Sequence, residues 1–157
     1  MVTYNNVVNA FKEITIAHKQ LGENHFYHGE PTDFQAVKDL KMPAILLQPM
    51  PTTNEIMIQQ YKFRLFYIDI IEADLTTLQD VYSDSLQVLN DIVNELEYNP
   101  DIGEYILNMS STYTPFQEKF DDLTAGNYVE ITINTPRNTN RCNTPMNSYT
   151  ATKTNND

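Results

Sequence analysis

The chain has 157 residues, of which 41% are hydrophobic, and a formal net charge of −11. No stretch approaches the roughly 18 apolar residues of a membrane-spanning helix, and the acidic balance excludes tight wrapping of a nucleic acid, which needs a basic surface. The single cysteine, Cys142, excludes an internal disulfide. Residues 1–13 lack the basic and apolar regions of a signal peptide, so we expect a reducing, cytosolic origin.

Charge is distributed unevenly along the chain. Residues 1–68 hold six acidic and six basic residues, whereas residues 69–122 hold thirteen acidic residues and only Lys119 as a base. Residues 137–157 are mildly basic. The acidic segment is either a solvated face that aids solubility, or a surface that repels a polyanion or meets a basic partner.

The first pattern in the chain predicts an amphipathic helix. Apolar residues recur at helical spacing from Tyr4 to Leu21. Asn5 or Thr3 can cap the start of this helix, and Gly22 can end it. We expect its apolar stripe to lie on the core of the protein.

Strand patterns follow this helix. Residues 25–29 predict a short strand, residues 30–40 a loop with a helical turn, and residues 44–47 an apolar strand between prolines. The longest strand signal runs from Glu55 to Ile71, where apolar and polar residues alternate before a nearly continuous apolar run. Because usual strands have about five or six residues, a bend or bulge is expected here.

A second helix is predicted from Asp74 to Leu96, with Thr76 and Gln79 as a capping box and Asn99-Pro100 after its end. Its predicted apolar stripe consists of Leu78, Tyr82, Leu86, Leu89, Ile92, Val93 and Leu96. The acidic residues that lie mostly outside this stripe are Asp80, Asp84, Asp91, Glu95 and Glu97. We interpret these five acids as candidates for a surface that repels a polyanion or meets a partner.

Three further strands are predicted after the second helix. They cover Glu104–Asn108, Ser111–Lys119 and Asn127–Thr135, the last one entered through a turn at residues 125–127. The order of elements predicts an α+β fold, a largely antiparallel sheet with two helices packed on one face. We predict that residues 1–136 form one domain.

Residues 137–157 differ in composition from everything before them. They hold six Asn and five Thr and too little apolar surface to offset the entropy of ordering. We expect an extended arm that is disordered unless it docks on a neighbouring subunit. The candidate assembly residues of this arm are Arg137, Arg141, Tyr149 and Lys153. Cys142 also lies in the arm, where no rigid base would be oriented to activate its thiol.

A metal site is the first chemical possibility to weigh. His25 and His28, with Glu30 and Asp33 nearby, have metal-binding side chains. Residues three apart on a strand point to opposite faces, so we expect the two histidines to diverge. The chain also lacks a cysteine pair and an HExxH motif.

A second possibility is a carboxylate site at Asp69, Glu72 and Asp74, between a strand end and a helix start. Such carboxylates can bind a divalent cation, but Asp74 is already expected to cap the helix. The chain has only four glycines and no phosphate-binding or nucleophile-elbow motif. We therefore predict no catalytic residues, no metal and no cofactor.

The layout resembles that of the tail terminator and tail-completion (head–tail joining, neck ring) proteins of tailed bacteriophages. The most family-like local stretch is DLTAGNYVEITINTP, residues 122–136. The resemblance covers about residues 4–136, and the Asn/Thr-rich tail departs from the compact members of the family. The matching pieces are residues 7–21, the strands at Phe26 and 44–47, residues 61–71, 74–96, 112–116 and 127–136.

This resemblance implies a virion structural protein that forms a closed homo-oligomeric ring in the connector, neck or tail end. It implies assembly in the host cytoplasm, with portal, connector or tail rings as neighbours and no membrane. Genomic DNA would pass through the ring without specific binding, and the five acids of the second helix would line its lumen or a subunit interface. Two other interpretations remain open: an intracellular acidic binding or adaptor module with a disordered tail, and an enzyme that uses Asp69 or Asp74.

Overall fold

The computed structural model describes residues 2–106, 111–117, 123–139, 142 and 145–147. Its helices are α1 (Tyr4–Ala17) and α2 (Leu78–Glu97), with short 3-10 helices η1 (Pro31–Ala36) and η2 (Gly103–Tyr105). Its strands are β1 (Phe26–His28), β2 (Ala44–Pro49), β3 (Thr53–Asn54), β4 (Ile58–Ile70), β5 (Tyr113–Gln117) and β6 (Thr124–Pro136).

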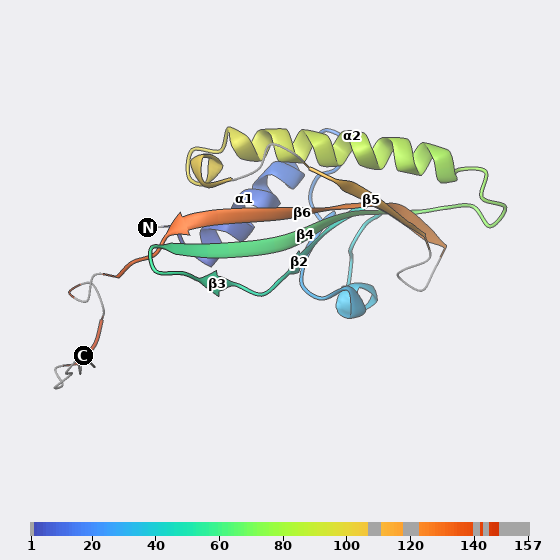
Figure 1. Cartoon of the computed structure of the whole chain (residues 1–157). Coiled ribbons are helices and arrows are strands. Elements are labelled where there is room, and N and C mark those ends of the chain that lie inside the picture. Colours follow the sequence, from blue (N-terminus) through green and yellow to red (C-terminus); the bar gives the residue numbers. More distant parts are fainter. Residues whose placement is uncertain (1, 107–110, 118–122, 140–141, 143–144, 148–157) are drawn as a thin grey trace.

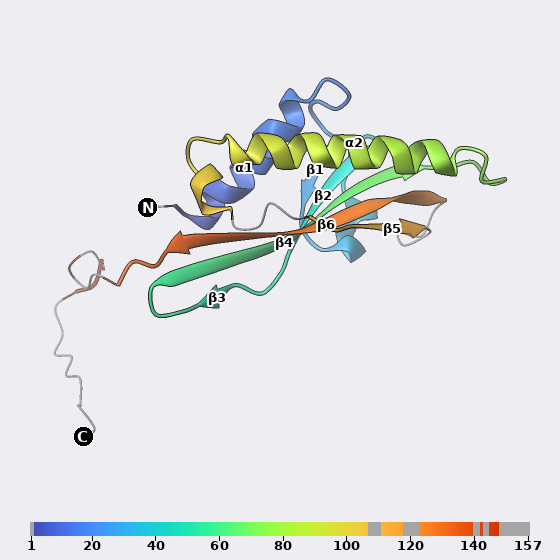
Figure 2. The same ribbon diagram turned by 45° about the horizontal axis from the view of Figure 1, so that its top comes forward.

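The described strands form one mixed sheet in the order β1-β2-β4-β6-β5, and β3 pairs with β4 beyond the end of β2. β1 and β2 are parallel, and the remaining pairings are antiparallel. The long helix α2 runs along the sheet with α1 beside it (Figures 1 and 2). The predicted α+β class with a largely antiparallel sheet is confirmed.

The core is built from alternate residues of the central strands. Phe63, Leu65 and Tyr67 of β4 join one buried cluster with apolar residues of α1 and α2, whereas Phe66 and Ile68 belong to a second cluster. This separation follows from the period of two in a strand. Leu89 and Ile92 of α2 are buried in the first cluster together with three sheet residues, Phe63, Leu65 and Ile131.

β4 and β6 run side by side without interruption, from the pair Ile58–Pro136 to the pair Ile70–Thr124. One residue faces one residue throughout this register, so the expected bulge is wrong. The predicted strand was too long because residues 55–57 form the connection between β3 and β4. Apolar residues in that connection continued the strand pattern past its true start.

The predicted start of α1 is confirmed, whereas its predicted end is wrong. Thr3 caps the helix in a capping box with Asn6, as one of the two proposed caps. The helix ends at Ala17, since the backbone of the next residue is extended. Leu21 fits the helical spacing of apolar residues, but it packs against the core from the loop that follows the helix. This is why the predicted helix was too long.

α2 begins at Leu78, later than the predicted Asp74. Leu75 has a φ of 63°, and this left-handed conformation cannot continue a right-handed helix. The predicted capping box is wrong, because Thr76 donates its backbone N–H and its hydroxyl to Asp74 instead. Thr77 occupies the cap position without a side-chain cap bond.

The apolar stripe of α2 is rotated slightly from the predicted one. Leu86 is 43% exposed, so its assignment to the stripe is wrong. Val81, Ser85 and Val88 are buried in its place. A serine was not expected there, but its hydroxyl donates to the carbonyl oxygen of Tyr82 at 2.9 Å.

After α2 the predicted elements are only partly correct. The strand at Glu104–Asn108 is wrong up to residue 106, where η2 is followed by a single bridge between Ile106 and Ile133. Residues 107–108 and 118–119 of the predicted strands lie outside the described residues. The turn at residues 125–127 is wrong as well, because β6 begins at Thr124 and passes through all three.

Candidate functional site

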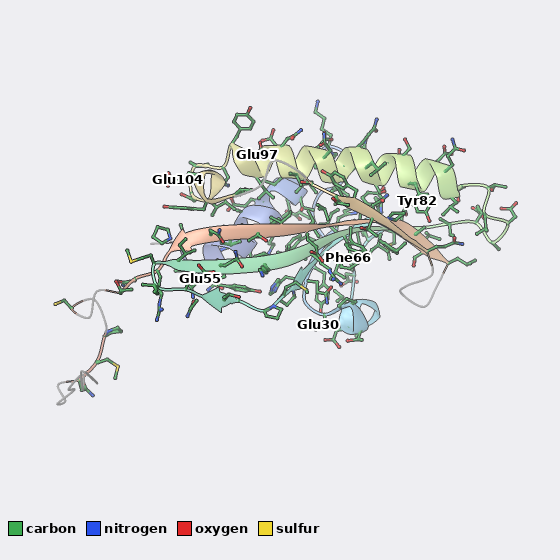
Figure 3. All side chains as sticks on the ribbon, viewed as in Figure 1. Glu30, Glu55, Phe66, Tyr82, Glu97 and Glu104 are labelled. Atoms are coloured by element: carbon green, nitrogen blue, oxygen red, sulfur yellow. The ribbon has the colours of Figure 1, made fainter. Side chains whose placement is uncertain are left out.

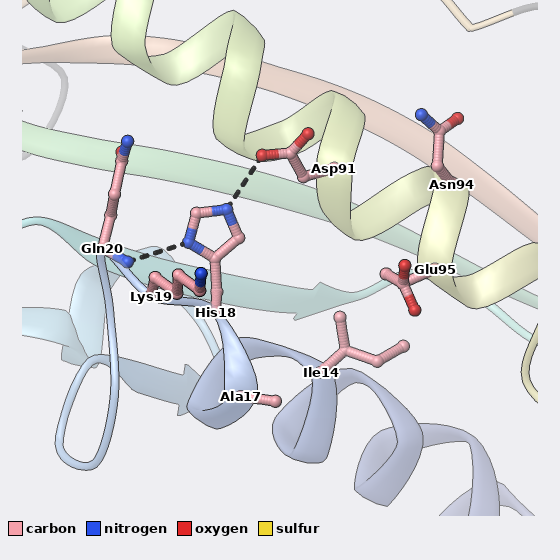
Figure 4. Close-up of a pocket in the computed structure, with 8 residues that line it drawn as sticks. All are labelled: Ile14, Ala17, His18, Lys19, Gln20, Asp91, Asn94 and Glu95. Atoms are coloured by element: carbon pink, nitrogen blue, oxygen red, sulfur yellow. Dashed lines mark hydrogen bonds and ion pairs between the residues drawn. The ribbon is translucent and has the colours of Figure 1, made fainter.

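A groove of about 590 Å³ lies between the C-terminal end of α1 and the C-terminal half of α2 (Figure 4). Ile14 and Ala17 of α1 supply part of its apolar lining, and α2 supplies carboxylates from the opposite side. The groove therefore offers both apolar and anionic contacts. Its lining residues are Ile14, Ala17, His18, Lys19, Gln20, Asp91, Asn94 and Glu95.

His18 and Asp91 connect the two sides of the groove. Nδ1 of His18 accepts the backbone N–H of Gln20 at 3.2 Å, so the Nε2–H donates to Asp91 Oδ2 at 2.9 Å (Figure 4). The His18 side chain is 14% exposed and that of Asp91 is 55% exposed. Asp91 consequently holds the helices together while part of its carboxylate remains accessible from the groove.

The five candidate acids do not share one environment. At 100° per residue, Asp80, Asp84, Asp91 and Glu95 fall within an arc of about 60°, and the centre of this arc is about 100° from the centre of the buried stripe of α2. All four are exposed, and Asp91 places this arc on the flank that faces α1. These four acids lie outside the buried stripe, as expected, but to one side of it and not opposite to it. Glu97 lies on another side and is half-buried.

Tyr67 and Asp69 of β4 lie close enough to Asp84 of α2 for their charges to interact. Burial raises the pKa of Tyr67 well above its usual range, and the negative charges of Asp69 and Asp84 add to the effect. Burial also raises the pKa of Asp69, against the hydrogen bond that its carboxylate accepts from the Ile70 N–H. Residues 69–106, which include Asp69 and Asp84, contain no lysine or arginine that could offset these charges.

The tip of the β3–β4 hairpin is an apolar surface that the sequence patterns did not identify. Glu55 and Ile58 close the hairpin, with the Glu55 N–H donating to the Ile58 carbonyl oxygen at 2.8 Å. Between them, Ile56 is 82% exposed and Met57 is 68% exposed. Figure 3 shows Glu55 at the end of this hairpin, far from Tyr82 at the start of α2. Loops usually have polar residues at such a position. Two apolar residues in this loop were therefore the one sequence feature that could have indicated the surface.

Arg137, the first residue of the predicted arm, binds to this tip. Its backbone N–H donates to the Met57 carbonyl oxygen at 2.9 Å, and its guanidinium donates to the Glu55 carbonyl oxygen at 3.0 Å. The structured chain thus continues past Pro136 by at least this residue. The other candidate arm residues, Arg141, Tyr149 and Lys153, lie outside the described residues.

The histidines considered for a metal site contact different elements. His25 donates from Nδ1 to the Pro43 carbonyl oxygen at 2.6 Å, while Nε2 of His28 is hydrogen-bonded to the Tyr4 hydroxyl at 2.8 Å. Burial lowers the pKa of His28. Both side chains therefore serve contacts within the fold.

Two of the carboxylates considered for a cation site, those of Asp69 and Asp74, accept local hydrogen bonds. Asp74 accepts two hydrogen bonds from Thr76, which lower the pKa of its carboxyl. Among the described residues, no group of three or more His, Cys, Asp or Glu side chains is placed to hold a metal ion. Cys142 is exposed.

The described helices include none that is long and apolar enough to cross a membrane. In comparisons with known proteins, the sequence matches no family model and no curated protein.

Proposed function

We propose that this protein is a virion structural protein of a tailed bacteriophage, and that its copies form a ring around the DNA channel in the head–tail connector, neck or tail end. The observation that carries the proposal is the one-sided charge of an ordered α+β scaffold. Residues 69–106 hold ten acidic residues and no basic one, and four of these acids lie along one flank of α2. A wall of like charge keeps a passing polyanion from adhering.

The acids of α2 lie in two different environments, which we assign to two different surfaces of the proposed ring. Asp80 and Asp84 are exposed on the N-terminal half of α2, and the negative charge of Asp84 acts on Asp69. We assign these two side chains to the lumen. Asp91 and Glu95 line the groove beside α1, and we assign them to contacts between subunits.

The order of elements adds support that is independent of charge. An N-terminal helix, a central long strand, a long acidic helix and a final long strand follow one another as in the tail terminator and tail-completion proteins that the sequence resembles. The exposed apolar tip at Ile56 and Met57 favours a protein that buries this surface against a partner, since isolated soluble proteins rarely display grouped apolar residues.

The mass of the purified chain in solution tests the ring. We expect native mass spectrometry to give one closed oligomer, and electron microscopy of the same sample to give rings with a central opening. Proteomic analysis of virions, purified from the phage that encodes the chain, should detect it as a component. A strict monomer at all concentrations that is also missing from virions would contradict the proposal and favour the adaptor interpretation.

A further inference from the structure

The hairpin tip is built to hold apolar side chains in water. Ile56 and Met57 lie between Glu55 and Ile58, whose backbone hydrogen bond closes the connection, and Ile58 itself is 37% exposed. The tip ends the longest strand pair of the sheet, where β4 is paired to β6 up to Ile58–Pro136. Ordered apolar side chains at the end of a long rigid element form a projection that costs little entropy to bury.

Arg137 reinforces this projection from the neighbouring strand. Its two hydrogen bonds to the carbonyl oxygens of Glu55 and Met57 fix the loop from the side of β6. The Arg137 side chain is exposed and brings a positive charge next to Ile56 and Met57. The projection therefore combines two apolar side chains with a guanidinium, while the carboxylate of Glu55 adds one negative charge.

The groove between α1 and α2 has the matching chemistry. It combines the apolar side chains of Ile14 and Ala17 with the carboxylates of Asp91 and Glu95, and the ammonium of Lys19 lies on its margin. Its volume of about 590 Å³ accommodates two side chains of the size of Ile and Met. None of the tip residues lines the groove of its own chain, so the two surfaces are available to different copies.

We propose that the β3–β4 tip of one copy inserts into the α1–α2 groove of the next copy, with Ile56 and Met57 against Ile14 and Ala17, and Arg137 near Asp91 and Glu95. This inference deepens the proposed ring and rests on it. The tip and the groove are different patches, so the contact is head-to-tail, and a head-to-tail contact closes into a ring when the rotation between copies permits. The occupant of the groove is thus a second copy of this chain.

The first experiment removes the apolar projection from the full-length chain. The double variant Ile56→Glu/Met57→Glu changes only exposed side chains, so its circular dichroism should match the wild type. On dilution, its oligomer should dissociate at a protein concentration at least about tenfold higher than the one at which the wild type dissociates, as the loss of one hot spot predicts. The control is Leu86→Glu, an exposed apolar position of α2 outside the groove, which should leave the mass unchanged.

The second experiment locates the contact. Two chains in a Cys142→Ser background, one with Met57→Cys and one with Ala17→Cys, are mixed and oxidised, so that any disulfide between them joins two copies. A control mixture uses Met57→Cys with Leu86→Cys. We expect the first mixture to form linked dimers within the oligomer, and the control mixture to form few.

The outcomes separate this contact from the ring itself. A closed oligomer that forms no Met57–Ala17 link, and keeps its mass in the double variant, overturns the tip-in-groove contact and leaves the ring in place. Equal linkage in both mixtures also overturns it, because the disulfides would then report random collision. A wild-type chain that stays monomeric at all concentrations overturns the ring and this contact together.

Discussion

Gly126 lies inside β6, opposite Ile68 of β4 and Phe116 of β5. A Cβ atom at this position would overlap the carbonyl oxygen of Tyr67 and would press on the ring of Phe116 at 3.2 Å. The backbone of a central strand cannot shift easily, so glycine is required here for close approach and not for a turn. We expect Gly126→Ala to lower the free energy of unfolding by about 1–3 kcal/mol, measured by urea denaturation.

Gly29 provides the matched control for this substitution. A Cβ atom there would meet only the end of the Tyr27 side chain, with its hydroxyl at 2.6 Å. That side chain can rotate away, so Gly29→Ala should cost clearly less than Gly126→Ala. If Gly126→Ala lowered the free energy of unfolding as little as Gly29→Ala, the backbones of β4 and β6 would have to separate locally without penalty.

His28 makes stability depend on pH. Its burial against Tyr4 lowers the pKa of the folded state below the ordinary value of 6.5. Below about pH 6.5 the unfolded chain takes up a proton at His28 that the folded chain resists, so the stabilisation present above this pH is lost as the pH falls. The urea midpoint should fall less between about pH 7.5 and pH 5 in His28→Gln than in the wild type. Parallel pH profiles would assign the acid sensitivity to other groups.

At the scale of elements, substitutions of two leucines in α2 test which face of this helix packs on the sheet. Leu89 is fully buried in the core cluster, whereas Leu86 on the same helix is 43% exposed. Leu89→Ala should lower the free energy of unfolding by roughly 2–5 kcal/mol, and Leu86→Ala should change it by less than about 0.5 kcal/mol. Chemical denaturation of both variants checks this pair. Similar losses at the two positions would contradict the described rotation of α2.

Periodicity predicted both helices and the α+β class, because burial of one face imposes a repeat that the sequence must carry. It failed at helix ends and turns, where the deciding feature is the backbone. Leu75 in a left-handed conformation delays the start of α2, and leucine gives no warning of this. Residues 125–127 contain a glycine and resemble a turn, yet they lie in the middle of a sheet.

The candidate surfaces were predictable only in part. The acidic residues of α2 are visible in the sequence, but the direction they face depends on a contact between His18 and Asp91, which are 73 residues apart. No local pattern encodes such a pair. The apolar tip was hidden for a different reason, since Ile56 and Met57 continue the pattern of β4 and were assigned to the strand.

At the scale of the whole molecule, two truncations distinguish the contribution of the arm from that of Arg137, its first residue. One chain ends after Pro136 and loses Arg137, and the other ends after Thr139 and keeps it. We expect both to remain folded, because β6 is complete in each, and both to assemble less well than the full chain. The shorter one should assemble worst, since its tip lacks two hydrogen bonds.

Circular dichroism and native mass spectrometry of the two truncated chains check this prediction. Full assembly of the chain that ends after Thr139 would show that the rest of the arm has no part in the ring. Outright unfolding of the chain that ends after Pro136 would instead place residues 137–157 in the core domain.

The proposed ring predicts an effect of the α2 charges on the passage of DNA. Asp80 and Asp84 are exposed and do not line the groove, so Asp80→Lys/Asp84→Lys should leave folding and assembly intact; exposed charges contribute only about 0–1 kcal/mol each. In a narrow channel with low-dielectric walls their summed field is concentrated. The variant ring should therefore retain DNA, and particles that carry it should eject their genome more slowly. Both effects should weaken at high salt, which screens the attraction.

The control, Glu30→Lys/Asp33→Lys, makes the same change in net charge at exposed residues around η1, away from α2 (Figure 3). Equal DNA retention by the two variants would mean that net charge, and not an acidic lumen, governs the effect.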